Sequence, residues 1–509
     1  MADEPMAEST VESRAGTLRG TVRGGVHVFK GVPYAAAPVG ALRFQAPLPS
    51  PPWSGVRDAV AYGARALQHD NALGVAPGLS EIGGGRREPM HEDCRFLNVW
   101  TPALDAKRPV MVWLHGGAFV TGSGSSPMYD GRSFARHEDV VVVTLNHRLG
   151  AFGFLNLAEA GGSAFADSGS AGMLDIVAAL EWVRDNIGRF GGDAGNVTLF
   201  GESGGGAKVS VLLAMPAARG LFHKAIIQSG PAVEMMTPAD ATAMARKVMA
   251  ELGADTAEDV VNAPAETLLE AQGAALHVVR SAAFAERRRV GFNPVIDGRH
   301  LPGGPFAPVA PAVSAHVPLI IGTNKDEMTL FLASAPWLKD LDEDGMIAAA
   351  RRFLGDEADR LVPAYRRARP DAAPRDIVLA LATDQGMRIP SLVMADRKVA
   401  LAGAPVFVYL FTWETPVFRG RLRSTHALEI PFVFDTLDSA APFVGEAAPR
   451  ELAATMRHTW AQFARTGSPA HAAIPPWPPY GPDDRPTMIF DVERRLAFDP
   501  FSEQRRAWY

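Results

Sequence analysis

The sequence predicts an α/β fold with a large, mostly parallel, twisted central sheet and helices on both of its faces. Residues 110–114 (VMVWL) and 140–145 (VVVVTL) are short, continuously apolar and rich in β-branched side chains, as strands covered on both faces are. Residues 173–190 then repeat apolar side chains near helical spacing, and residues 197–200 (VTLF) return to a strand pattern. Strand, helix and strand in this order indicate parallel pairing in a doubly wound sheet.

The later half of the chain follows the same plan. Helical patterns cover residues 237–252 and 453–465, and strand-like runs occur at 318–322 (PLIIG) and 406–411 (VFVYLF). We expect these strands to extend the first sheet, with helices inserted between them. Residues 1–509 are therefore expected to form a single domain, with mainly helical insertions within roughly 235–400.

Composition excludes several classes of partner. The 509 residues are 47% hydrophobic and 21% charged, which suits a globular protein with a large core. The formal net charge of −6 offers no basic surface for nucleic acid or an anionic membrane. Residues 1–14 lack the apolar core of a secretory signal, and no apolar run approaches the roughly 18 residues of a spanning helix. With Cys94 as the single cysteine, we expect a cytoplasmic protein without disulfides, membrane or nucleic acid.

A candidate nucleophile lies between a strand and a helix. Residues 201–205 (GESGG) fit the pattern G-x-S-x-G, and a helical segment at 206–215 follows them. A turn this tight strains the backbone of the serine, and the flanking glycines relieve the crowding. The positive end of the following helix also points toward the site, where negative charge would develop. These features predict Ser203 as a nucleophile.

The same residues allow two other interpretations. A glycine-rich turn whose serine merely caps the next helix has the same local pattern. A phosphate-binding loop needs lysine directly after its last glycine, followed by serine or threonine. Here Ala207 precedes Lys208 and the hydroxyl comes only at Ser210, so the phosphate-binding interpretation fails.

A second glycine-rich motif follows another predicted strand. Residues 115–119 (HGGAF) come directly after 110–114, and their backbone N–H groups could approach a carbonyl oxygen without hindrance. We assign the N–H groups of Gly117, Ala118 and Gly204 as the oxyanion hole, and we expect His115 to pack locally. A plain turn at the end of the strand is the alternative. It is disfavoured because both motifs lie at strand ends and serve one reaction.

Further segments occur in order along nearly the whole chain: 29–34 (FKGVPY), 38–44 (PVGALRF), 92–100 (EDCRFLNVW), 146–154 (NHRLGAFGF) and a dense run over 174–203. Together with the two motifs, they resemble the type-B carboxylesterases, the family that includes cholinesterases and bacterial para-nitrobenzyl esterases. The ordered series makes the resemblance specific, although each piece alone is weak.

The resemblance implies an α/β-hydrolase fold and a catalytic triad in the order serine, glutamate, histidine. Residues 322–327 (GTNKDE) match the family segment that carries the acid, which assigns Glu327 over its neighbour Asp326. Residues 424–434 (STHALEIPFVF) match the segment that carries the base, which assigns His426.

The resemblance also implies supporting residues and reveals departures. Glu202 and Ser229 match family positions that surround and support the triad. The family usually has alanine at Gly204 and glycine at Ala118; both changes keep the N–H, although glycine could loosen the hole. Secreted members pair the cysteine equivalent to Cys94, which has no partner here.

These assignments predict a hydrolase of small, uncharged carboxylic esters that forms a covalent acyl-enzyme and needs no cofactor or metal. Cleavage of amides, carbamates or thioesters, and acyl transfer to an alcohol, are open alternatives. A silent adhesion or scaffold protein is disfavoured by the intact triad, and no segment has the H-E-x-x-H spacing of a zinc protease. We expect activity to rise through neutral pH as His426 loses its proton, from a reference pKa of about 6.5.

The sequence leaves the substrate pocket and the oligomeric state open. Candidate pocket walls are the apolar residues Phe119, Phe284, Met328, Phe331 and Trp413, each of which could equally belong to the core.

Overall fold

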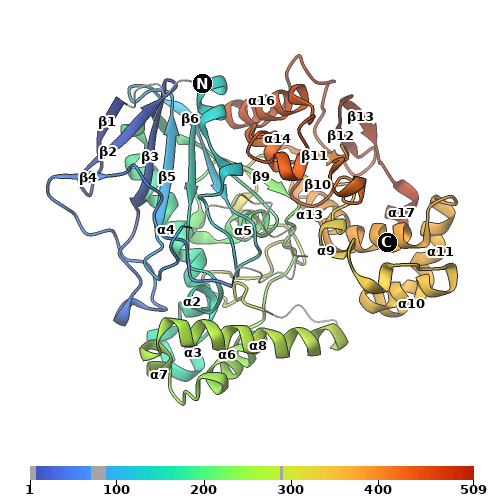
Figure 1. Cartoon of the computed structure of the whole chain (residues 1–509), viewed down its shortest axis with the longest axis horizontal. Helices are drawn as coiled ribbons and strands as arrows, with labels where there is room; N and C mark the ends of the chain where they lie inside the picture. The colour runs from blue at the N-terminus through green and yellow to red at the C-terminus, as the bar shows by residue number, and fades with distance from the viewer. Residues whose placement is uncertain (1–6, 70–87, 287–290) are drawn as a thin grey trace.

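A computed structural model of the chain describes residues 7–69, 88–286 and 291–509 (Figure 1). The described residues form one sheet of 13 strands in the order β1-β2-β3-β5-β7-β6-β8-β9-β10-β11-β12-β13, with β4 paired to β2. The strands are β1 (Ala7–Glu12), β2 (Thr17–Arg23), β3 (Val26–Pro33), β4 (Val56–Asp58), β5 (Phe96–Thr101), β6 (Arg108–Leu114), β7 (Val141–Leu145), β8 (Gly192–Glu202), β9 (Lys224–Gln228), β10 (Leu319–Asn324), β11 (Val406–Phe411), β12 (Pro486–Phe490) and β13 (Arg495–Phe498).

The sheet is parallel in its centre and antiparallel at its ends. Neighbours from β7 through β6, β8, β9, β10 and β11 to β12 pair in parallel. The first strands and β13 pair antiparallel with their neighbours. In Figure 1 the blue amino-terminal strands lie at one side of the molecule and the red carboxyl-terminal strands at the other. Every carboxyl end in the parallel block therefore faces the same edge, where α/β proteins place their sites.

Helices connect the parallel strands and cover both faces. They are α1 (Arg132–Glu138), α2 (Gly150–Phe154), α3 (Ala158–Gly161), α4 (Ala171–Asn186), α5 (Gly204–Ala214), α6 (Pro238–Leu252), α7 (Ala257–Asn262), α8 (Ala265–Glu286), α9 (Thr329–Leu332), α10 (Glu343–Leu354), α11 (Ala358–Ala368), α12 (Pro374–Thr383), α13 (Ile389–Val399), α14 (Ile430–Phe434), α15 (Ala441–Val444), α16 (Arg450–Thr466) and α17 (Ser502–Arg506).

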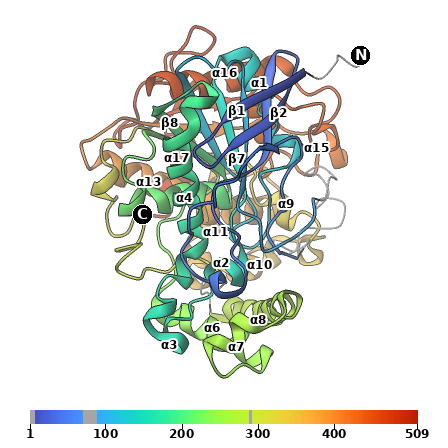
Figure 2. The same ribbon diagram turned by 90° about the vertical axis from the view of Figure 1, so that its left-hand side faces the viewer.

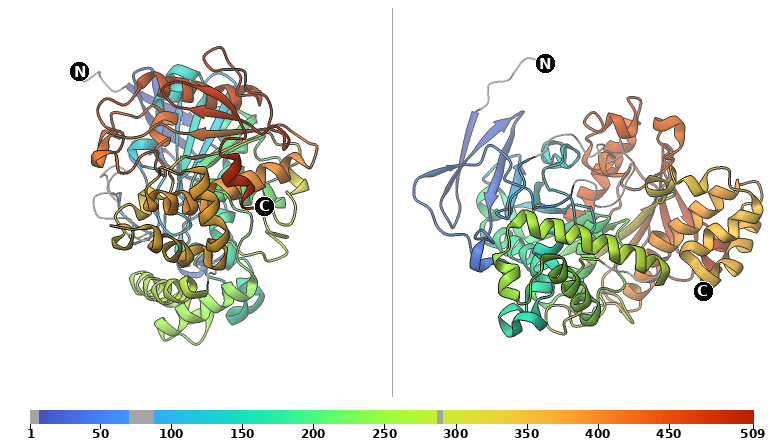
Figure 3. Two further views of the ribbon diagram at one scale, coloured as in Figure 1. Left: turned by 90° about the vertical axis from the view of Figure 1, so that its right-hand side faces the viewer. Right: turned by 60° about the horizontal axis from the view of Figure 1, so that its bottom comes forward.

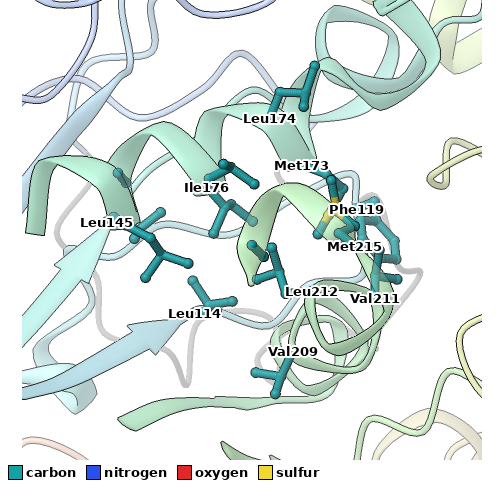
Figure 4. Packing of buried hydrophobic residues seen from close by; sticks show 14 of the residues in the cluster. Leu114, Phe119, Leu145, Met173, Leu174, Ile176, Val209, Val211, Leu212 and Met215 are labelled. Atoms are coloured by element: carbon teal, nitrogen blue, oxygen red, sulfur yellow. The ribbon is translucent and has the colours of Figure 1, made fainter. Parts of the chain in front are cut away.

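Alternation along each strand divides the interior into two cores. On β6, Val112 and Leu114 belong to the core that contains residues of α4 and α5, whereas Met111 and Trp113 belong to the core under α14 and α16. Successive side chains of a strand point to opposite faces, so a strand buried on both faces must be apolar throughout. Figure 4 shows Leu114 and Leu145 beneath α4 and α5.

Two groups of helices extend beyond the sheet layers. Helices α6–α8 separate β9 from β10 and lie together at the bottom of Figures 1 and 2. Helices α10–α12 separate β10 from β11, surround a small core of their own and contact α17 (Figure 3). Among the described residues, no helix has both the length and the apolar content that crossing a membrane requires.

The α/β architecture predicted from the sequence is confirmed. The five predicted strands are β6, β7, β8, β10 and β11, and the predicted helices are α4, α5, α6 and α16. Helix α4 ends at Asn186, and the last predicted turn is a 3₁₀ segment, Ile187–Phe190. The sequence did not predict the antiparallel strands at either end of the sheet, nor the short central strand β9.

Candidate active site

Ser203 lies in a strained turn at the carboxyl edge of the sheet. Strand β8 ends at Glu202, α5 begins at Gly204, and Ser203 between them has φ 55° and ψ −122°. Residues other than glycine rarely adopt a positive φ, and backbone strain of this kind occurs mainly at functional sites. The turn is held by the Ser203 N–H, which donates to the Gln228 carbonyl at 2.8 Å. Ser203 itself is only half-buried, so its hydroxyl is available at the surface of the site.

His426 and Glu327 form a buried hydrogen-bonded pair. Nδ1 of His426 lies 2.6 Å from Oε2 of Glu327, and both side chains are buried. The other carboxylate oxygen, Oε1, accepts the backbone N–H of Asn324 at 2.7 Å. A carboxylate at Nδ1 fixes the tautomer in which Nδ1 carries the proton, which leaves Nε2 as the basic nitrogen.

The free nitrogen of His426 faces the residue before the nucleophile. Nε2 lies 3.2 Å from Oε1 of Glu202 and makes no hydrogen bond within the described residues. No hydrogen bond joins Nε2 to Ser203 in this structure. Catalytic hydrogen bonds of unliganded enzymes are often long or poorly aligned and tighten when substrate binds.

Glu429 is a buried acid of the site that sequence reasoning missed. Its carboxylate accepts hydrogen bonds from Nε2 of Gln228 at 3.0 Å and from Nδ2 of Asn324 at 2.7 Å. A glutamate one turn after His426, inside the otherwise apolar run 427–434, was the signal that could have found it. Buried charges require such partners, and an acid in an apolar run is therefore informative.

Three carboxylates around one imidazole shift the pKa values of the site. Burial alone would lower the pKa of His426, but the carboxylates of Glu202 and Glu327 outweigh it and raise the pKa to about 9. Burial raises the pKa of Glu202 well above its usual value, and the positive charge of His426 opposes this shift in part. Burial and the nearby Glu327 likewise raise the pKa of Glu429. The protonated imidazole is therefore more stable here than in water. Activity is accordingly expected to rise at a higher pH than an unperturbed histidine would give.

The three backbone N–H groups assigned from the sequence to an oxyanion hole, those of Gly117, Ala118 and Gly204, have no protein acceptor in the part of the chain that the structure describes. A Cβ placed on Gly204 would lie 2.3–2.4 Å from the oxygen, Cα and nitrogen of Ala118, so the two backbones are in contact. Ala118 has φ 52°, a second strained residue at the site. The glycine at 204 therefore permits a close approach of the loop.

Two other residues named from the sequence, Asp326 and Ser229, make no hydrogen bond to the imidazole of His426. Asp326 lies 3.6 Å from Nζ of Lys325 and 3.9 Å from Nη1 of Arg423. Ser229 is buried; its N–H donates to Gly322, and its Oγ has no hydrogen-bond partner within residues 7–69, 88–286 and 291–509. The geometry thus pairs Glu327, not Asp326, with His426.

Of the candidate pocket walls, Phe331 packs against the histidine. Its ring centroid is 5.2 Å from that of His426, and the side chain is half-buried. Phe119 is buried against Phe154, and Trp413 packs against Phe432. The side chain of Phe284 lies outside the described residues.

Comparisons with known proteins show the family of the chain. The model of the carboxylesterase family matches residues 7–508. The chain is 38% identical to para-nitrobenzyl esterase of Bacillus subtilis (strain 168) over 98% of both chains, and 36% identical to phenmedipham hydrolase of Pseudarthrobacter oxydans, again over 98% of both. The crystal structure of a Geobacillus stearothermophilus carboxylesterase at pH 6.2 matches with a TM-score of 0.85 and 39% identity, covering 98% of this chain and 100% of that chain. The chain therefore belongs to the carboxylesterase family and is a carboxylic ester hydrolase with the α/β-hydrolase fold.

Proposed function

We propose that the chain hydrolyses uncharged carboxylic esters through a triad of Ser203, His426 and Glu327 and a covalent acyl-enzyme. The observation that carries the proposal is the pairing of His426 with Glu327 at Nδ1, which leaves Nε2 unbonded beside the strained turn of Ser203. A serine hydroxyl needs such a base to become a nucleophile at neutral pH.

In the first half-reaction, Nε2 of His426 takes the hydroxyl proton while Oγ of Ser203 bonds to the ester carbonyl carbon. The carbonyl oxygen becomes negatively charged and accepts hydrogen bonds from the N–H groups of Gly117, Ala118 and Gly204. The bond to the alcohol oxygen then breaks, and that oxygen takes the proton from Nε2. Water repeats the sequence on the acyl-enzyme: it gives a proton to Nε2, attacks the carbonyl carbon and releases Oγ, which regains the proton.

Glu202 and Ser229 are proposed to support the triad. The carboxylate of Glu202, 3.2 Å from Nε2, would stabilise the imidazolium that forms in both half-reactions. Ser229 follows Gln228, the residue whose carbonyl holds the Ser203 N–H and whose side chain binds Glu429. Its hydroxyl is buried.

The triad is tested by Ser203→Ala. We expect at least a roughly 10⁴-fold loss of kcat on an activated ester such as para-nitrophenyl acetate, with unchanged circular dichroism. Ser391→Ala, which removes a buried hydroxyl from α13, is the matched control and should retain activity. Turnover at the normal rate in the Ser203 variant would refute the proposal.

The substrate class is tested with a panel of para-nitrophenyl esters of increasing chain length, together with anilides, carbamates and thioesters. Phenmedipham, the compound in the name of one relative, joins the panel. We expect a higher kcat/KM on esters than on the anilides, because the phenol is a better leaving group than the aniline. A higher kcat/KM on anilides would assign the site to amide cleavage instead.

A further inference from the structure

Lys208 is a fully buried lysine one turn beyond the nucleophile on α5. Its Nζ donates to the carbonyl oxygen of His115 at 2.9 Å, and it lies 5.5 Å from the ring centroid of Phe119. No ion pair involving Lys208 occurs among the described residues. Burying an amine without a carboxylate is unfavourable, and burial lowers the pKa of Lys208 to about 7. A neutral amine still donates a hydrogen bond, so the contact with His115 does not depend on the charge.

The acceptor of this hydrogen bond is the first residue of the oxyanion loop, residues 115–119. The next carbonyl, that of Gly116, accepts Nδ1 of His115 at 2.8 Å, and the carbonyl of Gly117 accepts the N–H of Thr121 at 3.1 Å. The loop carbonyls are therefore turned toward protein donors. Because each peptide is planar, fixing the carbonyls of Gly116 and Gly117 also fixes the N–H groups of Gly117 and Ala118 in the same peptides. The His115 carbonyl shares its peptide with the N–H of Gly116, so Lys208 holds the peptide that precedes these two.

The hydrogen bond of Lys208 joins this loop to the helix that follows the nucleophile. Gly204, the first residue of α5, contacts Ala118 of the loop through its backbone. The third N–H of the hole thus belongs to α5 and the other two belong to the loop. Their relative placement depends on how the loop is held against α5.

We propose that Lys208 is a positioning residue that fixes the oxyanion loop against α5, through its hydrogen bond to His115, so that the N–H groups of Gly117, Ala118 and Gly204 point at one oxygen. The inference rests on the proposed function, because it assigns these three groups to the oxyanion. Lys208 touches no reacting atom and acts through the loop.

The test is Lys208→Met, which keeps the length of the side chain and removes the donor. We expect kcat on para-nitrophenyl acetate to fall about tenfold, less than the 10²–10³ typical of losing a hole donor, with KM changed by less than about twofold. The affinity for a trifluoromethyl ketone, whose adduct carries an oxyanion, should weaken by the same factor as kcat/KM. Lys208→Gln, which can still donate an N–H, should recover part of both losses.

Lys398→Met is the matched control. Lys398 is also a buried lysine, its Nζ donates to the carbonyl of Ser314, and burial lowers its pKa to about 8. Because Ser314 precedes the amino end of β10, opposite the active site, this variant should keep the wild-type kcat and ketone affinity.

Wild-type kcat and ketone affinity in Lys208→Met would overturn the inference. So would equal losses in Lys208→Met and Lys398→Met, or failure of both Lys208 variants to fold, because either result assigns Lys208 to stability alone. The proposed triad would survive each of these results, since it depends on the inactivity of Ser203→Ala.

Discussion

At the scale of single residues, the environment of His426 governs the expected pH dependence. In the proposed mechanism the free enzyme is active when Nε2 is unprotonated, and the carboxylates of Glu202 and Glu327 stabilise the protonated form. A raised pKa means that the base loses its proton at a higher pH than the reference of about 6.5. The acid limb of kcat/KM should therefore lie above that value, toward about 9.

Glu202→Gln should move that limb to lower pH. The amide keeps the size of the side chain and removes the charge beside Nε2, so the imidazolium loses stabilisation and the pKa of His426 falls. A profile of kcat/KM between pH 5 and 10 measures the shift. Glu181→Gln, a change at an exposed position of α4, is the control. The same midpoint in all three proteins would show that Glu202 does not control the base.

The contact between Gly204 and Ala118 makes a second prediction at this scale. In Gly204→Ala, the new Cβ would lie 2.3–2.4 Å from backbone atoms of Ala118, so the loop must shift. We expect kcat to fall about tenfold or more, up to the 10²–10³ typical of a lost hole donor. Gly188→Ala places its Cβ in open space and should leave kcat unchanged. Unaltered kcat in Gly204→Ala would show that the loop adapts without loss.

At the scale of elements, hydrogen bonds of buried side chains tie the ends of the central strands to the helices behind them. Nε1 of Trp460 on α16 donates to Gln228 at the end of β9, and Gln228 donates to Glu429 just before α14. Asn324 at the end of β10 donates its side chain to Glu429 and to the carbonyl of Thr425. The loop that carries His426 is thereby fixed to two strands.

Asn324→Ala should loosen this junction. The change removes one of the two side-chain donors to the Glu429 carboxylate and the side-chain donor to the Thr425 carbonyl, which costs about 1–3 kcal/mol of unfolding free energy. Urea denaturation measures this loss, and kcat should fall with it because His426 is less well placed. Asn156→Ala, which removes a single 3.3 Å hydrogen bond to Thr242, serves as the control. Equal stability of the two variants would contradict the importance of the junction.

Elements with strong apolar patterns were predictable, and short or half-polar ones were not. The strands β7 and β11 are buried throughout and mostly apolar because helices cover both of their faces. Strand β9 has five residues, with lysine and glutamine at its ends, too short a run for a period to be recognised. In strands β1 and β2, which pair antiparallel, buried residues alternate with more exposed ones. Their sequences therefore resemble surface loops.

At the scale of the whole molecule, the site combines residues that local chemistry could and could not predict. Ser203 followed from its position between a strand and a helix. Glu327 and His426 were assigned by family resemblance, because one acid or imidazole in a loop has no local signature. Lys208 could be recognised only as a misfit to a phosphate-binding loop. Its burial beneath the oxyanion loop depends on contacts between β6 and α5, which are distant in sequence.

We also expect the whole chain to unfold as one unit, with the helices inserted between β9 and β11 included. Residues of α6, α8 and α13 share the core of the sheet. Helices α10–α12 have a separate small core but contact α17 from the end of the chain. Differential scanning calorimetry should show one transition. A separate, earlier transition in which residues 343–383 alone lose protection from hydrogen exchange would divide the chain into two units.

The most direct test of the central claim is covalent labelling by an organophosphate, followed by peptide mass spectrometry. Attack by Oγ of the nucleophile would leave one phosphoryl group per chain on the peptide that contains Ser203. Esterase activity should fall in proportion to that label, and Ser203→Ala should remain unlabelled. A label on any other residue, or full activity in fully labelled protein, would contradict the account.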